Sequence, residues 1–162
     1  MLKKLALASV MLFGITVVAV ASNNEYGNLF ANIYFDLNSA VIGDGGEFRI
    51  NNIAEEVKEP KCTNVVVVGY GCKLGSGWYN DMLAQKRADA VRDALVRKGF
   101  SVGRITTESR GNREQSRIWR TINQDRQYDR SADFNEYNRV AEVYVLPRVS
   151  WYDEFKCSRG RE

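Results

Sequence analysis

Histidine is missing from this 162-residue chain, and its absence restricts the chemistry that the protein can perform. Without it the chain can form neither a Ser-His-Asp nor a Cys-His nucleophile system, and it lacks the commonest general base and catalytic zinc ligand. No pair of carboxylates stands out as a replacement. We therefore expect a protein that is not an enzyme and that uses no metal and no other cofactor.

The chain also has a small net charge and few cysteines. The 23 basic residues nearly balance the 20 acidic ones, which does not favour nucleic acid as a partner. The cysteines, Cys62, Cys72 and Cys157, show the spacing of no metal-binding motif. Because their number is odd, at least one of them must stay outside any disulfide within the chain.

The N-terminus has the pattern of an export signal. A basic start at Lys3 and Lys4 precedes an apolar run over 5–21, and Ala19-Val20-Ala21 is a typical cleavage site before Ser22. The alternative is an anchor that is never cleaved, although 17 residues span only about 25 Å as a helix against a hydrocarbon core of about 30 Å. We expect residues 1–21 to be a signal peptide and the mature chain to be periplasmic, without a membrane span.

The rest of the chain predicts one domain over 30–147, after a flexible leader at 22–29. Alternating or continuous apolar residues predict strands, and recurrence every three or four residues predicts helices. The predicted elements are a strand over 30–37, a helix over 46–58, a buried strand over 63–70, a helix over 79–98, and strands over 104–109 and 140–146. This order predicts an α/β sandwich with helices packed on a mixed four-stranded sheet.

Apolar spacing also predicts which side of each helix is buried. For the first helix the inward residues are Phe48, Ile50, Ile53, Ala54 and Val57. For the second they are Met82, Leu83, Ala90, Val91, Ala94 and Leu95, with Lys86, Arg87, Arg92, Asp93 and Arg97 outward. Residues 112–138 form an Arg-rich insertion before the last strand, and 148–162 form a C-terminal tail.

Five short motifs occur in the order and spacing of a known family. They lie within Ile33–Asn38 (IYFDLN), Val67–Ser76 (VVGYGCKLGS), Tyr79–Val91, Val96–Ile105 and Asn138–Glu142 (NRVAE). Over about residues 32–146 the chain resembles the OmpA-like peptidoglycan-binding domain, of the OmpA C-terminal, Pal and MotB type. The resemblance implies a domain of a Gram-negative cell envelope, associated with the outer membrane or the wall, that binds the diaminopimelate of the peptidoglycan stem peptide.

The resemblance also implies which residues bind. Arg87 stands at the position of the arginine that holds the ligand's carboxylate, and Asn38 at the position of a polar residue that contacts the peptide. The aspartate that pairs with the ligand's ammonium is replaced by Cys72, whose neutral thiol cannot do so. Losing half of a desolvated charge pair costs about 2–5 kcal/mol. The full expected set is Phe35, Asp36, Asn38, Cys72, Leu74, Asn80 and Arg87.

Three functions remain open at this point. The first is non-covalent binding of peptidoglycan, which positions an envelope complex. The second is a structural subunit of a secretion or motility complex that keeps the fold but has lost wall binding, which the change to Cys72 favours. The third is a thiol-based redox protein that uses Cys72, although no Cys-x-x-Cys motif is present.

Two further features concern the partners of the domain. In the Arg-rich insertion, Arg117, Trp119 and Arg120 combine residue types common in binding hot spots, so they are candidates for contact with another envelope protein. Ile118, Trp119 and Ile122 also suggest a short helix there. If the last strand runs antiparallel to the strand over 63–70, its exit lies near Cys62, which predicts a Cys62–Cys157 disulfide and a free Cys72.

Overall fold

The computed structural model describes residues 29–72, 74–114, 116–117, 120 and 136–146. The predicted signal peptide, nearly all of the leader, most of the Arg-rich insertion with its short helix, and the C-terminal tail lie outside these residues. The expectations that concern them therefore stay predictions.

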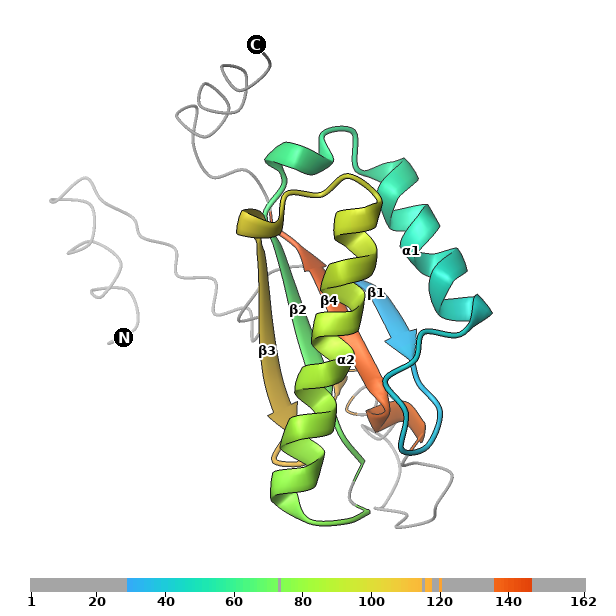
Figure 1. Cartoon of the computed structure of the whole chain (residues 1–162), viewed down its shortest axis with the longest axis vertical. Coiled ribbons are helices and arrows are strands. Elements are labelled where there is room, and N and C mark those ends of the chain that lie inside the picture. The colour runs from blue at the N-terminus through green and yellow to red at the C-terminus, as the bar shows by residue number, and fades with distance from the viewer. Residues whose placement is uncertain (1–28, 73, 115, 118–119, 121–135, 147–162) are drawn as a thin grey trace, which may run out of the picture.

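A mixed four-stranded sheet forms the centre of the fold (Figure 1). Its strands are β1 (Leu29–Tyr34), β2 (Val65–Tyr70), β3 (Ile105–Gly111) and β4 (Val140–Val145), arranged in the order β1-β4-β2-β3. β4 is antiparallel to both β1 and β2, whereas β2 and β3 are parallel. The predicted fold class is confirmed, and so is the antiparallel pairing on which the predicted disulfide depends.

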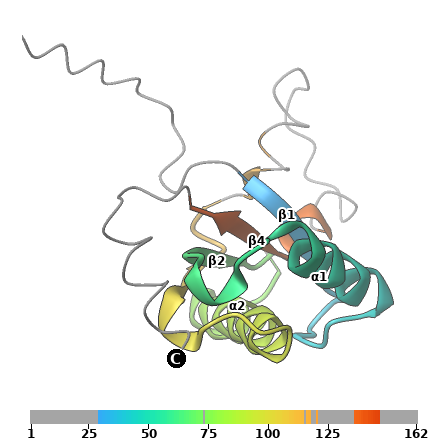
Figure 2. The ribbon, with the colours of Figure 1, turned by 90° about the horizontal axis from the view of Figure 1, so that it is seen from above.

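Two helices, α1 (Asp44–Glu56) and α2 (Gly77–Arg97), cover one face of the sheet (Figures 1 and 2). Short 3-10 turns at Pro60–Cys62, Val102–Arg104 and Glu136–Asn138 precede β2, β3 and β4. The main core lies between helices and sheet, and its fully buried members include Ile33, Ile50, Val67, Val91, Leu95 and Val143. Within the described part of the chain, no helix is both long and apolar enough to cross a membrane.

The second face of the sheet is buried as well. Every residue of β2 is buried, as the continuous valine run predicts for a strand covered on both sides. Among the apolar residues of this face lies Glu142 of β4, whose side chain is fully inaccessible to solvent. Its carboxylate accepts hydrogen bonds from the Tyr144 hydroxyl at 2.6 Å and from the Arg117 backbone N–H, which fastens the start of the Arg-rich insertion to the sheet.

Several predicted boundaries are wrong by two or three residues, and the predicted face of Phe48 is wrong as well. Strand β1 ends at Tyr34 instead of residue 37, because the chain turns at Asn38, which has a left-handed backbone with φ of 57°. Helix α1 begins at Asp44, two residues earlier than predicted. Phe48 is 65% exposed, because it lies two residues from Ile50 and therefore on nearly the opposite side of the helix.

The largest correction concerns Arg87, which was expected to point outward. Its side chain is only 1% exposed and faces the sheet. Arg87 lies four residues after Leu83 and four before Val91, so it belongs to the same buried face of α2. Spacing alone places it inside, and only its charge suggested the outer side.

Candidate functional site

One end of the sheet gathers most of the residues expected to bind. Because β1 and β2 are both antiparallel to β4, their C-terminal ends lie beside the start of β4. The loops after β1 and β2 meet the N-terminal half of α2 and the 3-10 turn at Glu136–Asn138 at this end (Figure 1). Topology thus brings four of the five motifs together, whereas the motif within Val96–Ile105 lies at the opposite end of the sheet, where Ile105 pairs with Val65.

Arg87 lies beneath these loops and holds them by their backbone. Its guanidinium donates to the carbonyls of Ser39 at 2.9 Å, Tyr70 at 2.9 Å and Asp36 at 3.2 Å. These carbonyls belong to the loop after β1 and to the end of β2. Burial lowers the pKa of Arg87 to about 10, so it stays protonated at neutral pH. Arg87 therefore fixes two loops against α2.

Phe35 connects Arg87 to a second arginine, Arg139. The Phe35 ring lies 5.4 Å from the Arg87 guanidinium, in the arrangement of a cation–π contact. On the other side, the Phe35 N–H donates to the Arg139 carbonyl at 2.8 Å, and Arg139 Nε donates to the Phe35 carbonyl at 3.3 Å. The first residue after β1 thus links the two guanidinium groups.

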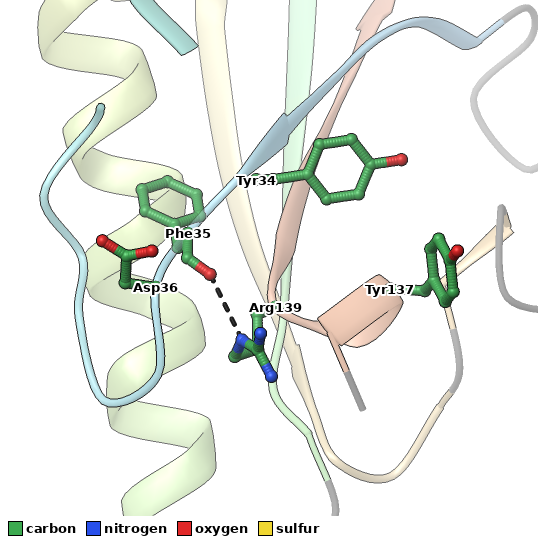
Figure 3. Close-up of a pocket in the computed structure, with 5 residues that line it drawn as sticks. All are labelled: Tyr34, Phe35, Asp36, Tyr137 and Arg139. Carbon is green, nitrogen blue, oxygen red and sulfur yellow. Dashed lines mark hydrogen bonds between the residues drawn. The ribbon is translucent and has the colours of Figure 1, made fainter. Parts of the chain in front are cut away.

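A pocket of about 360 Å³ opens beside this link (Figure 3). Its walls are Tyr34, Phe35, Asp36, Tyr137 and Arg139. Asp36 is exposed and Arg139 is half-buried, so an acidic and a basic residue both line the same pocket. An anion and a cation on the walls of one pocket suit a ligand that carries both charges.

The remaining expected residues shape the loops around this end. Asn38 accepts a hydrogen bond from the Tyr79 hydroxyl, which ties the loop after β1 to the first turn of α2. Asn80 is 2% exposed and donates to the Leu74 carbonyl at 2.9 Å, which closes the loop after β2. The Leu74 side chain is 52% exposed. Asn38 and Asn80 therefore hold loops in place.

Cys72 is a free thiol, as predicted, and is 6% exposed. The two side chains lie within electrostatic range of each other, because a negative charge at Cys72 would partly offset the lowering of the Arg87 pKa that burial causes. The position that the family pattern gives to an aspartate is therefore next to the buried arginine, and it holds an uncharged group. The structure brings Phe35, Asp36, Cys72 and Arg87 together.

Arg139 was not among the expected site residues. Its signal in the sequence is the Asn138-Arg139 pair of the closing motif. The neighbouring Asn138 is 4% exposed and accepts from the Ser116 N–H at 2.9 Å. This bond anchors the turn that carries Arg139.

The described residues include only part of the expected partner surface and only one cysteine of the predicted disulfide. Arg120 is exposed and Arg117 is half-buried, while Trp119 lies outside the described residues. Cys157 lies outside them too, so its bridge to Cys62 stays a prediction. The pairing of Val65 with Val145 supports it, because the exit of β4 lies beside the start of β2, close to Cys62.

These features define a class of protein: a small α/β domain with a pocket, lined by residues of both charges, at one end of a mixed sheet. The family model of the OmpA family matches residues 34–130, more than half of the chain. The chain belongs to the OmpA family, whose domains of this kind are non-enzymatic.

Relatives in sequence and structure agree with this assignment. The chain is 34% identical over 89 residues to outer membrane protein A of Shimwellia blattae, covering 54% of this chain and 37% of that protein. It is 40% identical over 84 residues to outer membrane protein 40 of Porphyromonas gingivalis, covering 51% and 22%. The chain thus spans well under half of these relatives' length. The peptidoglycan-associated lipoprotein of Burkholderia pseudomallei has the same fold, with a TM-score of 0.60, 23% identity, and coverage of 71% and 89%.

Proposed function

We propose that the domain binds peptidoglycan non-covalently through the stem peptide, and that it holds an envelope complex against the wall. The observation that carries this proposal is the pocket in which Asp36 and Arg139 present opposite charges. Membership of the OmpA family supports it, and so does the resemblance of the motifs to peptidoglycan-binding domains. The outer membrane proteins among its relatives favour the periplasm of a Gram-negative bacterium as its location.

The side chain of diaminopimelate ends in both a carboxylate and an ammonium, so it needs a cation and an anion within reach. Arg139 uses Nε for the Phe35 carbonyl, and its two terminal nitrogens are suited to a bidentate bond with a carboxylate. Asp36 is suited to the ammonium. In this proposal Asp36 supplies the negative charge that Cys72 cannot.

Arg87 has an indirect role in this proposal. With 1% of its surface exposed and three N–H groups bound to carbonyls, it positions the pocket wall from below. One of those carbonyls belongs to Asp36 itself, and Phe35 packs on the guanidinium. Arg87 thereby determines where the Asp36 carboxylate stands.

Retention of the purified protein on isolated peptidoglycan sacculi tests the proposal. We expect the unmodified protein to be retained, and Arg139→Gln and Asp36→Asn each to weaken retention roughly 5- to 30-fold, because each removes half of a partly solvated charge pair. Arg97→Gln is the matched control, since it removes an exposed arginine from the far end of α2. No retention of the unmodified protein, or equal losses in all three variants, contradicts the proposal.

Cys72 favours a second function, in which the domain is a structural subunit that has lost wall binding. Cys72→Asp separates the two, because a carboxylate beside Arg87 restores the family's charge pair. If the domain binds the wall through Asp36 and Arg139, the unmodified protein should be retained without this change. If only the Cys72→Asp variant is retained, the structural function is the correct one.

A further inference from the structure

Ser116 joins the start of the Arg-rich insertion to its end. Its backbone N–H donates to the Asn138 side-chain oxygen at 2.9 Å, and its hydroxyl donates to the Tyr137 carbonyl at 2.7 Å. Its own carbonyl accepts a hydrogen bond from the Arg120 backbone N–H at 3.0 Å. Ser116 is fully buried, and each of its polar groups has a hydrogen bond, as burial requires. It therefore closes the base of the insertion, across 22 positions of the chain.

The turn that Ser116 contacts carries two walls of the pocket that contains Asp36. Tyr137 lies in this turn and Arg139 is the first residue after it, and both line the pocket (Figure 3). The Phe35 N–H donates to the Arg139 carbonyl at 2.8 Å. Because Ser116 bonds to the two residues before it, the Arg139 backbone is held both directly and through its neighbours.

The segment that carries Ser116 is itself fastened to the sheet. The next residue, Arg117, donates its backbone N–H to the Glu142 carboxylate, and the Tyr144 hydroxyl donates to the same carboxylate at 2.6 Å. Glu142 belongs to β4 and is fully inaccessible to solvent. Hydrogen bonds to an ionised acceptor are stronger than those between neutral groups. The start of the insertion is thus a rigid support for the turn.

We propose that Ser116 is a positioning residue for the wall pocket: by bonding to Tyr137 and Asn138, it sets where the Arg139 guanidinium stands. Ser116 is not one of the described walls of the pocket, so it acts through Arg139 and contacts no ligand. Groups behind a binding side chain fix its position to within a fraction of an ångström. The effect on wall binding rests on the proposed function, whereas the effect on Arg139 can be measured on the protein alone.

Ser116→Ala in the full protein tests this inference, because it removes the bond to Tyr137 and keeps the backbone bond. Retention on sacculi should fall roughly 2- to 10-fold, less than for Arg139→Gln, because the guanidinium is displaced and not removed. Ser109→Ala is the matched control. The Ser109 hydroxyl donates to the Asp81 carbonyl of α2 at 2.9 Å, a partly buried bond of the same kind that does not involve the turn. The control should keep its retention.

A double-mutant cycle separates positioning from a general loss of stability. In the Arg139→Gln background, Ser116→Ala should weaken retention no further, because its effect passes through the Arg139 guanidinium. Its effect on the free energy of unfolding should be the same in both backgrounds. The Arg139 Nε–H, which donates to the Phe35 carbonyl at 3.3 Å, gives a readout without any ligand. Its NMR signal should shift in Ser116→Ala and stay in place in Ser109→Ala.

Three results overturn the inference. The first is equal retention of Ser116→Ala and Ser109→Ala, and the second is a full further loss from Ser116→Ala in the Arg139→Gln background. The third is an Arg139 Nε–H signal that Ser116→Ala leaves unchanged. If the unmodified protein is not retained on sacculi, the proposed function is wrong, and the Nε–H signal alone then decides whether Ser116 positions Arg139.

Discussion

Replacing Arg87 by alanine should destabilise the domain by about 3–5 kcal/mol. The guanidinium serves three carbonyls, of which that of Tyr70 is buried and those of Asp36 and Ser39 are partly buried. Hydrogen bonds from a charged donor contribute about 1.5–3 kcal/mol each, and a buried carbonyl left without a donor costs about 1–3 kcal/mol. In the alanine variant, water can reach the two partly buried carbonyls, and the free-energy cost of burying the charged guanidinium no longer applies. Both effects make the net loss smaller than the sum of the hydrogen bonds. The net loss should therefore lie near that of breaking a buried ion pair.

Urea unfolding followed by circular dichroism measures this loss by linear extrapolation. Arg92→Ala is the matched control, because Arg92 is an arginine of the same helix whose side chain is 30% exposed and pairs with Asp89 at 2.9 Å. An exposed pair of this kind contributes less than about 1 kcal/mol. A loss below about 1 kcal/mol for Arg87→Ala, or equal losses for both variants, would show that Arg87 does not hold the loops.

Two further predictions concern the two faces of the sheet. Burial, followed by the charge of Glu142 and a hydrogen bond to it, raises the pKa values of Tyr70 and Tyr144 above the usual value of about 10. The stability that the buried, protonated phenols provide is fully present below a pH of about 10 and is lost as the pH rises further. In a spectrophotometric titration both phenols should therefore ionise only when the protein unfolds. Their ionisation in the folded state near pH 10 would contradict the second-face network. Gly69→Ala should destabilise the domain by more than about 3 kcal/mol, because the new Cβ would collide with a backbone carbonyl of α2. Gly103→Ala, where a Cβ meets nothing within 4 Å, should be nearly neutral in the same unfolding assay.

If the domain binds the wall as proposed, residues at different depths contribute to that binding. Asp36 and Arg139 line the pocket, whereas Arg87 acts through the backbone that carries them. A variant of Arg87 should therefore lose stability and retention together. Variants of the two pocket residues should lose retention alone. Comparing both assays for each variant distinguishes contact from positioning.

The elements of the fold could be predicted from the amino-acid sequence. The valine run of β2, the apolar spacing of α2 and the order of strands and helices predicted a mixed sheet covered by helices, because burial follows periodicity. The motifs predicted the family, since their spacing fixes which loops meet. They also placed Arg87 and Cys72 at one site. The errors concern helix and strand ends, the face of Phe48, which was assigned from its apolar side chain, and the face of Arg87, which was assigned from its charge.

The roles of the charged side chains at the site could not be predicted from the sequence, because they depend on tertiary contacts. Arg87 has the spacing of a buried residue and the charge of an exposed one, and its burial becomes possible because three carbonyls from distant segments converge on it. Arg139 reaches the pocket because β4 pairs beside β1, which brings together residues 104 positions apart. Such convergence has no local pattern in the sequence. It arises from strand pairing, which places backbone groups where a single side chain can satisfy them.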